Sequence, residues 1–272
     1  MSTRMRLATI AGTGLLGAAL AAAPAGAAAA AGAGAAATAR TGRVSSLCRR
    51  YQHLGVATAQ GAHFLVKNDN YGGRGECLAV RGEEPNFTVT RSPVPAWHPK
   101  PQAYPFILRG CSWGTCSAPD SGLPRRADAL RRPVATWSTI QVNGGEWDAA
   151  FDTWFGTRPM TTGQAGGAEL MIWLSARRVP VPRLAPVVRI DHARWHLLHW
   201  RACHAGTCWN YVQFRRVRPV LGVRHLRLLP FIHRAERHGW VRPSWWLENI
   251  EAGFELWQGG TGLATDWFWA RA

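Results

Sequence analysis

A glutamate in a strand-like segment is the first residue of this sequence whose surroundings suit chemistry. In residues 168–174, the alternation of side chains along a strand places Glu169, Met171 and Trp173 on one face and three aliphatic residues on the other. A solvent-facing side would normally carry several small or charged residues, so a single carboxylate beside Met and Trp is typical of a concave ligand-binding face. An ordinary exposed glutamate on a partly covered strand is the competing interpretation.

Two further segments repeat this combination of an acid, a small or soft neighbour and a tryptophan. Glu255 shares a strand face with Trp257, and Asp152 shares one with Trp154. Pyranose rings offer C–H faces to indole and hydroxyl groups to carboxylates, and 15 tryptophans in 272 residues fit that use. Cleavage of a glycosidic bond needs two carboxyl groups with divergent pKa values, one to attack as an anion and one to donate a proton. Glu169 and Glu255 are therefore candidates for this chemistry if the fold brings them together.

Short apolar runs, broken every 8 to 12 residues by Gly, Pro, Asn or Asp, fill the chain after Ser46. This spacing predicts an all-β fold, a sandwich or jelly roll. The expected strands lie at 63–67, 77–80, 87–90, 106–108, 136–142, 149–155, 168–174, 187–190, 195–200 and 209–214. One helix is expected over 229–238, because Pro230 suits a first turn and Gly239 a stop.

The first 45 residues differ in composition from the rest. Two arginines precede an apolar run over 7–23, and Ala25-Gly26-Ala27 offers a small-residue cleavage site, so residues 1–27 are expected to be a secretory signal peptide. An uncleaved membrane anchor is the alternative, since the run approaches the lower limit for spanning a bilayer. Residues 28–45 lack apolar periodicity and are expected to be a flexible Ala/Gly-rich leader. Residues 46–272 would then form one folded domain.

Export implies an oxidising compartment, in which an even number of cysteines tends to pair completely. The cysteines are Cys48, Cys77, Cys111, Cys116, Cys203 and Cys208. Three disulfides are expected among fifteen possible connectivities. The third and fourth cysteines, and likewise the fifth and sixth, are close enough in sequence to close one hairpin or loop each, which would leave the first with the second.

The formal net charge of +16 raises the question of a nucleic acid or another anionic partner. The basic residues are scattered over every segment and form no stripe, and removal of residues 1–45 would take away four arginines and no acid. We therefore expect an arginine-rich solvated surface and no nucleic-acid partner.

The motifs around the candidate carboxylates are long. They read Glu169-Leu170-Met171-Ile172-Trp173 and Ala252-Gly253-Phe254-Glu255-Leu256-Trp257-Gln258-Gly259-Gly260. Both resemble the nucleophile strand and the acid/base strand of glycoside hydrolase family 12, and 149–155 is similar to that family's Ala-Ala-Tyr-Asp-x-Trp-Phe strand. The segments 104–106 and 110–116 are also similar to the family's pattern, which supports a bridge within 111–116. The resemblance covers roughly residue 48 to the C-terminus.

The resemblance implies a single-domain curved β-jelly-roll with an open cleft. It further implies a retaining endo-β-1,4-glucanase with Glu169 as nucleophile and Glu255 as general acid/base. Asp152 would hydrogen-bond the nucleophile and tune its ionisation. No metal and no organic cofactor would be required.

Sugar contacts are expected from the residues that share faces with these acids, namely Trp154, Met171, Trp173 and Trp257. Where the family has Asn-Asn-x-Trp-Gly, residues 68–72 begin with Asn68 and carry Tyr71 in place of the tryptophan, so both are expected to contact substrate, with Tyr71 as a distal platform. The loop 179–184 resembles a Pro-x-Gly loop over the cleft but lacks its glycine.

The expected protein is thus a secreted, extracellular monomer that acts on a β-glucan, whether cellulose, mixed-linkage glucan or xyloglucan, with no membrane contact after signal cleavage. A non-catalytic carbohydrate-binding jelly roll is the alternative, because it could keep the tryptophan face without both glutamates. A metal protein is a third interpretation, suggested by His192, His196, His199, Cys203, His204 and Cys208.

Overall fold

The computed structural model describes residues 43–82, 84–95, 100–180, 182 and 185–272. The expected signal peptide, most of the expected leader and residues 181, 183 and 184 of the loop 179–184 lie outside these ranges. Strand β1 (Val44–Leu47) pairs with β4 and starts two residues before Ser46, where the folded domain was expected to begin. Within the described ranges, no helix is long and apolar enough to cross a membrane.

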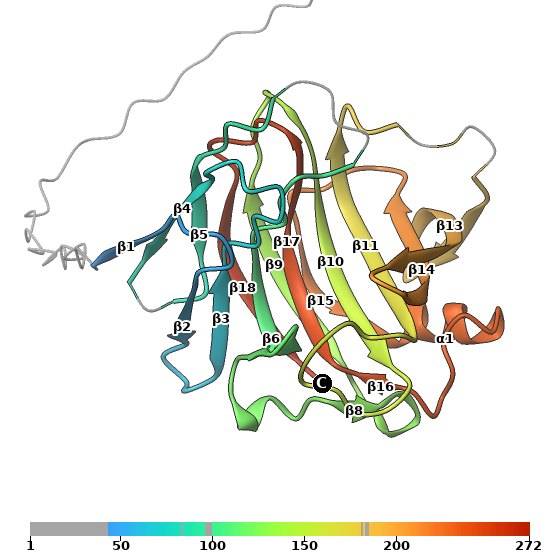
Figure 1. The fold of residues 1–272 in the computed structure, drawn as a ribbon. Helices are drawn as coiled ribbons and strands as arrows, with labels where there is room; N and C mark the ends of the chain where they lie inside the picture. Colours follow the sequence, from blue (N-terminus) through green and yellow to red (C-terminus); the bar gives the residue numbers. More distant parts are fainter. Residues whose placement is uncertain (1–42, 83, 96–99, 181, 183–184) are drawn as a thin grey trace, which may run out of the picture. The chain divides into compact units, whose positions relative to one another are not determined.

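Two β-sheets make up the fold (Figure 1). The smaller sheet has the order β1, β4 (Cys77–Arg81), β5 (Phe87–Arg91), β18 (Ala264–Arg271), β9 (Val134–Ile140) and β15 (Gly222–Arg227). The larger sheet has the order β12 (Val187–Ile190), β13 (Ala193–His204), β14 (Thr207–Arg216), β11 (Ala168–Arg177), β10 (Glu146–Gly156), β17 (Asn249–Gln258), β6 (Phe106–Ser112), β3 (His63–Lys67) and β2 (His53–Ala57). Its described strand pairs are antiparallel apart from β11 with β14.

The remaining elements are short. They are β7 (Thr115–Cys116), η1 (Pro119–Ser121), β8 (Arg125–Arg126), η2 (Ala127–Ala129), α1 (Leu229–Arg237) and β16 (Trp246–Leu247). The predicted curved all-β sandwich with one short helix is confirmed, and each expected strand overlaps an observed one. Strands β1, β2, β15 and β18 were not among the strands named from the sequence, and β15 lies within an Arg/His-rich stretch.

Aromatic side chains join the two sheets. Phe64 of β3 meets Phe268 of β18 with ring centroids 5.6 Å apart, and Phe87 of β5 meets Phe254 of β17 at 6.0 Å, both edge to face. Such pairs combine large buried apolar area with a favourable quadrupole geometry. Because these rings hold the inner face of the larger sheet, its other face is left available for a ligand.

The strand faces fall as the alternation of residues predicts. Leu170, Ile172 and Leu174 of β11 lie in the core between the sheets, whereas Met171 and Trp173 belong to a separate cluster on the outer face. The long strands β11, β10 and β17 run side by side and curve (Figure 1). Strand β10 lies between the other two, so it positions the residues that both of them carry.

All three expected disulfides are present: Cys48–Cys77, Cys111–Cys116 and Cys203–Cys208. The last two each close a hairpin, β6 with β7 and β13 with β14. The oxidised state of Cys203 and Cys208 removes both from the ligand set of the metal-protein interpretation.

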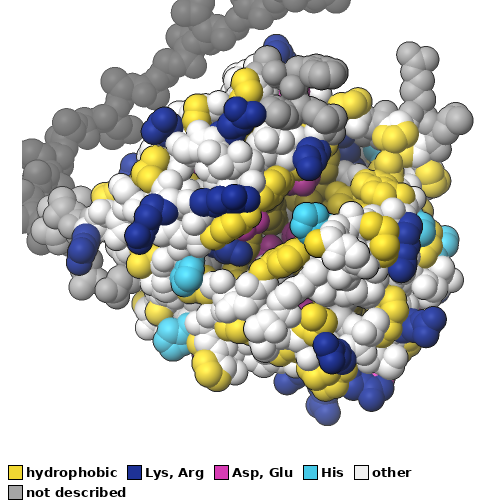
Figure 2. Space-filling model, viewed as in Figure 1, with side chains coloured by type: hydrophobic (Ala, Val, Ile, Leu, Met, Phe, Trp, Pro, Cys, Tyr) yellow, Lys and Arg dark blue, Asp and Glu magenta, His cyan; other side chains and the backbone are white. Residues whose placement is uncertain are grey.

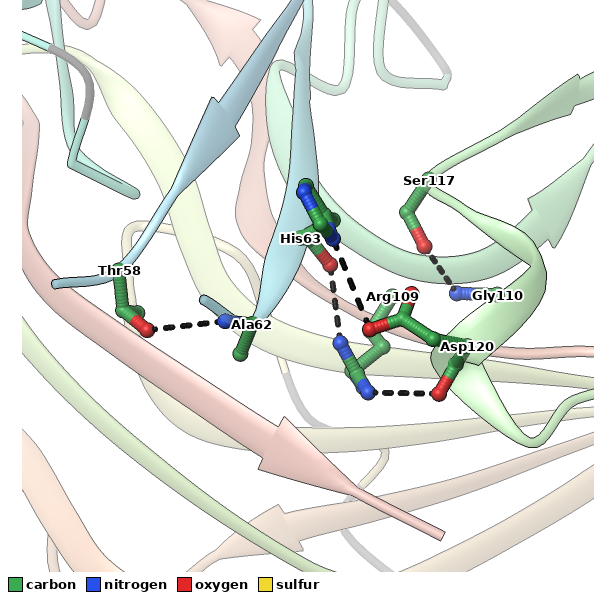
Figure 3. Close-up of polar contacts among 7 residues, drawn as sticks. All are labelled: Thr58, Ala62, His63, Arg109, Gly110, Ser117 and Asp120. Carbon is green, nitrogen blue, oxygen red and sulfur yellow. Dashed lines mark hydrogen bonds and ion pairs between the residues drawn. The ribbon is translucent and has the colours of Figure 1, made fainter. Parts of the chain in front are cut away.

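A buried arginine fixes β6 against β3 and η1 (Figure 3). The guanidinium of Arg109 donates to the backbone oxygen of His63 at 3.0 Å and to that of Asp120 at 3.1 Å, while the His63 ring lies 3.5 Å from the Asp120 carboxylate. Gly110 N–H donates to Ser117 Oγ at 3.0 Å, and at the β2–β3 turn Ala62 N–H donates to Thr58 Oγ1 at 3.3 Å. These contacts hold the end of β6 that neighbours β17.

Candidate active site

Strand β10 brings the predicted carboxylates together. Trp154 lies opposite Glu169 of β11, and Asp148 lies opposite Glu255 of β17. Directly opposed residues of an antiparallel pair point to the same face of a sheet, so all four side chains share the outer face with Asp152. The pairs are offset along β10, but the charge of Glu255 contributes to the raised pKa of Glu169, so the two glutamates are near enough to interact. Figure 2 shows acidic side chains within a hollow, bordered by hydrophobic ones.

The acids of this face are buried to an unusual degree. Asp148 is fully buried, Asp152 is 5% exposed and Glu169 is 9% exposed, while Glu255 is half-buried. Charged groups this deep in a protein are normally paired with cations. Here the charge of Arg215 acts on Asp148, while the other side chains that act on Asp148, Asp152 and Glu169 are carboxylates and tryptophans. Burial favours the protonated form of each of these carboxyl groups.

The donor to Glu169 is a tryptophan that the sequence did not single out. Trp209 Nε1 donates to Glu169 Oε2 at 2.6 Å. Burial raises the pKa of Glu169 to about 8, and this hydrogen bond opposes the rise. Since an indole N–H can only donate, it favours the ionised carboxylate.

The predicted hydrogen bond from Asp152 to Glu169 is replaced by a different arrangement. Asp152 Oδ2 accepts from Trp154 Nε1 at 2.9 Å, and the rings of Trp154 and Trp209 lie 5.4 Å apart. Burial, followed by the charge of Glu169, raises the pKa of Asp152 well above its ordinary value. The charge of Glu169 thus acts on Asp152. Two neighbouring tryptophans each donate one N–H, Trp154 to Asp152 and Trp209 to Glu169.

The partner of Glu255 is another carboxyl group. Asp148 lies opposite Glu255, its Oδ1 has no hydrogen-bond partner among the described residues, and Trp257 Nε1 donates to its Oδ2 at 3.1 Å. Burial raises the pKa of Glu255 to about 7, while the neighbouring Asp148 side chain lowers it. Burial and then the charge of Glu255 raise the pKa of Asp148 well above its ordinary value. The ionisation of each carboxyl group therefore depends on the other.

Gly253 explains how β17 comes close to its neighbour. A Cβ at this position would lie 2.2 Å from the backbone oxygen of Pro105 and 2.7 Å from Cβ of Phe106. Only glycine permits this approach of β17 to β6. Just before β6, Tyr104 donates its hydroxyl to the backbone oxygen of Ala150 on β10 at 3.1 Å.

The residues predicted to contact sugar lie at different depths. Trp154, Trp257 and Tyr71 are half-buried, and Tyr71 packs on a cluster of Leu65, Tyr104, Phe106 and Leu108. Burial raises the pKa of Tyr71 well above its ordinary value, with further contributions from the charges of Glu255, Asp69, Asp148 and Glu169, as expected for a tyrosine beside these acids. These three side chains have surface to offer a ligand.

Three other predicted contacts are covered in this structure. Met171 is 1% exposed and Trp173 is 3% exposed, and the Arg215 guanidinium lies 5.5 Å from the centre of the Trp173 ring. Asn68 is fully buried and its amide donates to the backbone oxygens of Leu47 and Glu76, each at 3.1 Å. The predicted sugar contact at Asn68 is therefore wrong, because this amide ties β1 to the segment before β4.

Comparison with known proteins agrees with this geometry. Residues 74–271 match the model of glycosyl hydrolase family 12. A metagenome-derived family 12 endoglucanase has 36% sequence identity and a TM-score of 0.75, over 84% of this chain and 97% of its own. Endoglucanase Cel12A from Rhodothermus marinus has 36% identity and a TM-score of 0.74, over 84% and 98% of the two chains.

A curated relative points the same way. The probable cellulase Cel12b of Mycobacterium tuberculosis is 28% identical over 127 residues, which are 47% of this chain and 82% of the relative. These similarities favour a hydrolase over the non-catalytic carbohydrate-binding interpretation. The chain belongs to glycosyl hydrolase family 12 and is a glycoside hydrolase of the cellulase type.

Proposed function

We propose that the enzyme is a secreted, retaining endo-β-1,4-glucanase that cleaves β-glucan with Glu169 as nucleophile and Glu255 as general acid/base. The observation that carries the assignment is the contrast between the partners of the two glutamates. Glu169 receives an N–H from a group that can only donate, which favours its ionised form, whereas Glu255 lies opposite the buried carboxyl group of Asp148. A nucleophile needs the first environment and a proton donor needs the second.

The proposed reaction proceeds by double displacement. The ionised Glu169 attacks the anomeric carbon while Glu255 transfers its proton to the departing glycosidic oxygen, which leaves a sugar esterified to Glu169. Glu255, now ionised, then takes a proton from water as the water attacks the same carbon and releases Glu169. Loss of negative charge from Glu169 in the first step favours the second role of Glu255, because the remaining acids face less repulsion.

The substrate proposal rests on the outer face and on the relatives. Half-buried Tyr71, Trp154 and Trp257 surround the acids, and indole and phenol rings suit the C–H faces of glucosyl units. The two solved structures described above are named endoglucanases. An endo-acting enzyme fits a hollow that crosses several strands (Figure 2).

Two substitutions test the assignment. Glu255→Gln is expected to lower kcat/KM on barley β-glucan about 10²- to 10⁴-fold, which is the usual contribution of a general acid. Glu169→Ala is expected to lose at least as much, and exogenous azide should restore turnover with an inverted glycosyl azide as product. Glu84→Gln, at an exposed position, is the matched control, and its kcat/KM on barley β-glucan should equal that of the wild type.

The stereochemistry gives an independent measurement. Proton NMR of the first products should show the β-anomer before mutarotation. Initial release of the α-anomer, or unchanged turnover in either glutamate variant with native circular dichroism, would overturn the proposal.

A further inference from the structure

An exposed tryptophan on β13 stands level with the nucleophile. Trp200 is 44% exposed and lies opposite Tyr211 of β14, which in turn lies opposite Glu169 of β11. Opposed residues of neighbouring strands share a face. Trp200, Tyr211 and Glu169 therefore form a row across three strands on the face that holds the catalytic acids.

The row is continuous with the active site. Tyr211 packs on the outer-face cluster of Met171, Trp173 and their neighbours. Burial raises the pKa of Tyr211 well above its ordinary value, and the charges of Glu255 and Glu169 add to the rise, so the Tyr211 hydroxyl lies near both acids. The Trp200 ring stacks on the Tyr211 ring with centroids 4.0 Å apart and planes at 23°. One aromatic surface thus extends from the acids to the exposed indole.

The hairpin that carries this pair is held in place at its tip and on its other face. Cys203 and Cys208 close it by a disulfide a few residues beyond Trp200. The Asn210 side chain donates to the Trp240 oxygen at 2.9 Å, and the Trp240 ring stacks on His199 at 4.2 Å. A fixed aromatic platform binds a ring with little further loss of side-chain entropy.

We propose that Trp200, stacked on Tyr211, forms a binding subsite for a glucosyl unit of the β-glucan chain beyond Glu169, on the side away from β10. The inference deepens the proposed function and rests on it. A large exposed indole would otherwise present an apolar surface to water beside the hollow, and its continuity with the catalytic face favours a sugar ring as its occupant over an unrelated partner.

The test uses cello-oligosaccharides of increasing length with the full enzyme. In the wild type, kcat/KM is expected to rise when the substrate becomes long enough to reach Trp200. Trp200→Ala should lower kcat/KM about tenfold on the longest substrate. It should leave kcat/KM on the shortest cleaved substrate unchanged. Trp200→Tyr should keep most of the rise in kcat/KM with length. Trp267→Ala is the matched control, since Trp267 is 43% exposed on β18 of the smaller sheet and should show no change.

The outcomes separate the two proposals. Loss of activity by the same factor at every length, or no change at any length, would overturn the subsite and leave the catalytic assignment standing. Failure of the wild type to cleave any β-glucan would overturn the proposed function and this subsite with it.

Discussion

Asp148 and Glu255 lie directly opposite each other on β10 and β17. Asp148 is fully buried, and among the described residues Trp257 donates to its Oδ2. The proposed acid/base therefore has a partner that can itself take up or release a proton. This arrangement makes the pH dependence of the enzyme a property of the pair.

Asp148→Ala is expected to move the alkaline limb of kcat/KM to higher pH. The Asp148 side chain lowers the pKa of Glu255, so its removal lets burial raise that pKa above about 7, and Glu255 then stays protonated over a wider range. Asp148→Asn keeps a donor and should leave the limb nearer its original position. A shift to lower pH in the alanine variant would contradict the role given to Asp148.

Trp209→Phe is expected to move the acidic limb of kcat/KM to higher pH. Loss of the indole donor removes the hydrogen bond that opposes the rise in the pKa of Glu169, so the nucleophile ionises only at higher pH. Trp154→Phe is the matched control, because it removes an indole donor from Asp152 and should shift this limb less. Equal shifts of the acidic limb in both variants would show that the hydrogen bond from Trp209 does not specifically set the pKa of Glu169.

Glu76→Gln is expected to stabilise the protein at neutral and alkaline pH. Glu76 is fully buried, neither of its carboxylate oxygens has a partner among the described residues, and burial followed by the charge of Asp69 raises its pKa to about 8. An acid whose pKa is raised by folding supports the fold at low pH and loses that support as pH rises towards 8.

Urea unfolding at pH 5 and pH 8 measures this effect. The variant should gain on the order of 2 kcal/mol in the free energy of unfolding at pH 8 and little at pH 5. Glu84→Gln, at an exposed position, should show no such pH dependence. A gain of the same size at both pH values would point to packing rather than ionisation.

The disulfides are expected to differ in their contribution to stability. Cys48–Cys77 closes a sequence separation of 29 residues, whereas Cys203–Cys208 closes one of 5. Loop-closure entropy predicts losses of about 3.5 and about 2 kcal/mol when each pair is replaced by serine. Thermal unfolding of the two double variants compares them directly. A larger loss of stability from removal of Cys203–Cys208 would show that this disulfide stabilises the β13–β14 hairpin by more than chain entropy.

The sequence predicted the strand faces well where residues alternate cleanly. Strands β11 and β10 each have apolar residues on one face and polar or aromatic residues on the other. The alternation of residues therefore determines which way Glu169 and Asp152 point. The helix was equally clear, because Pro230 and Gly239 mark its ends. Family motifs added the link between Glu169 and Glu255, which alternation alone does not provide.

Partners across strands were the part that the sequence did not reveal. Trp209 is distant from Glu169 in sequence, and nothing in its neighbourhood marks it as a donor to a carboxylate. The motif at Asn68 suggested a sugar ligand, yet tertiary contacts bury that amide against backbone oxygens. Strand β15 escaped notice because arginine and histidine conceal its few apolar positions. Hydrogen-bond partners depend on register, and register is set by the whole sheet.

The central place of β10 limits how this protein can change over time. One strand faces both glutamates, with Asp148 beside one and Trp154 beside the other. A slip of the whole strand by one residue would turn Asp148 and Asp152 into the apolar interior and bring Phe151 to the outer face. Evolution can therefore retune the acidity of this enzyme by exchanging residues along β10, whereas it has freedom to alter lengths only in the loops beyond the strand.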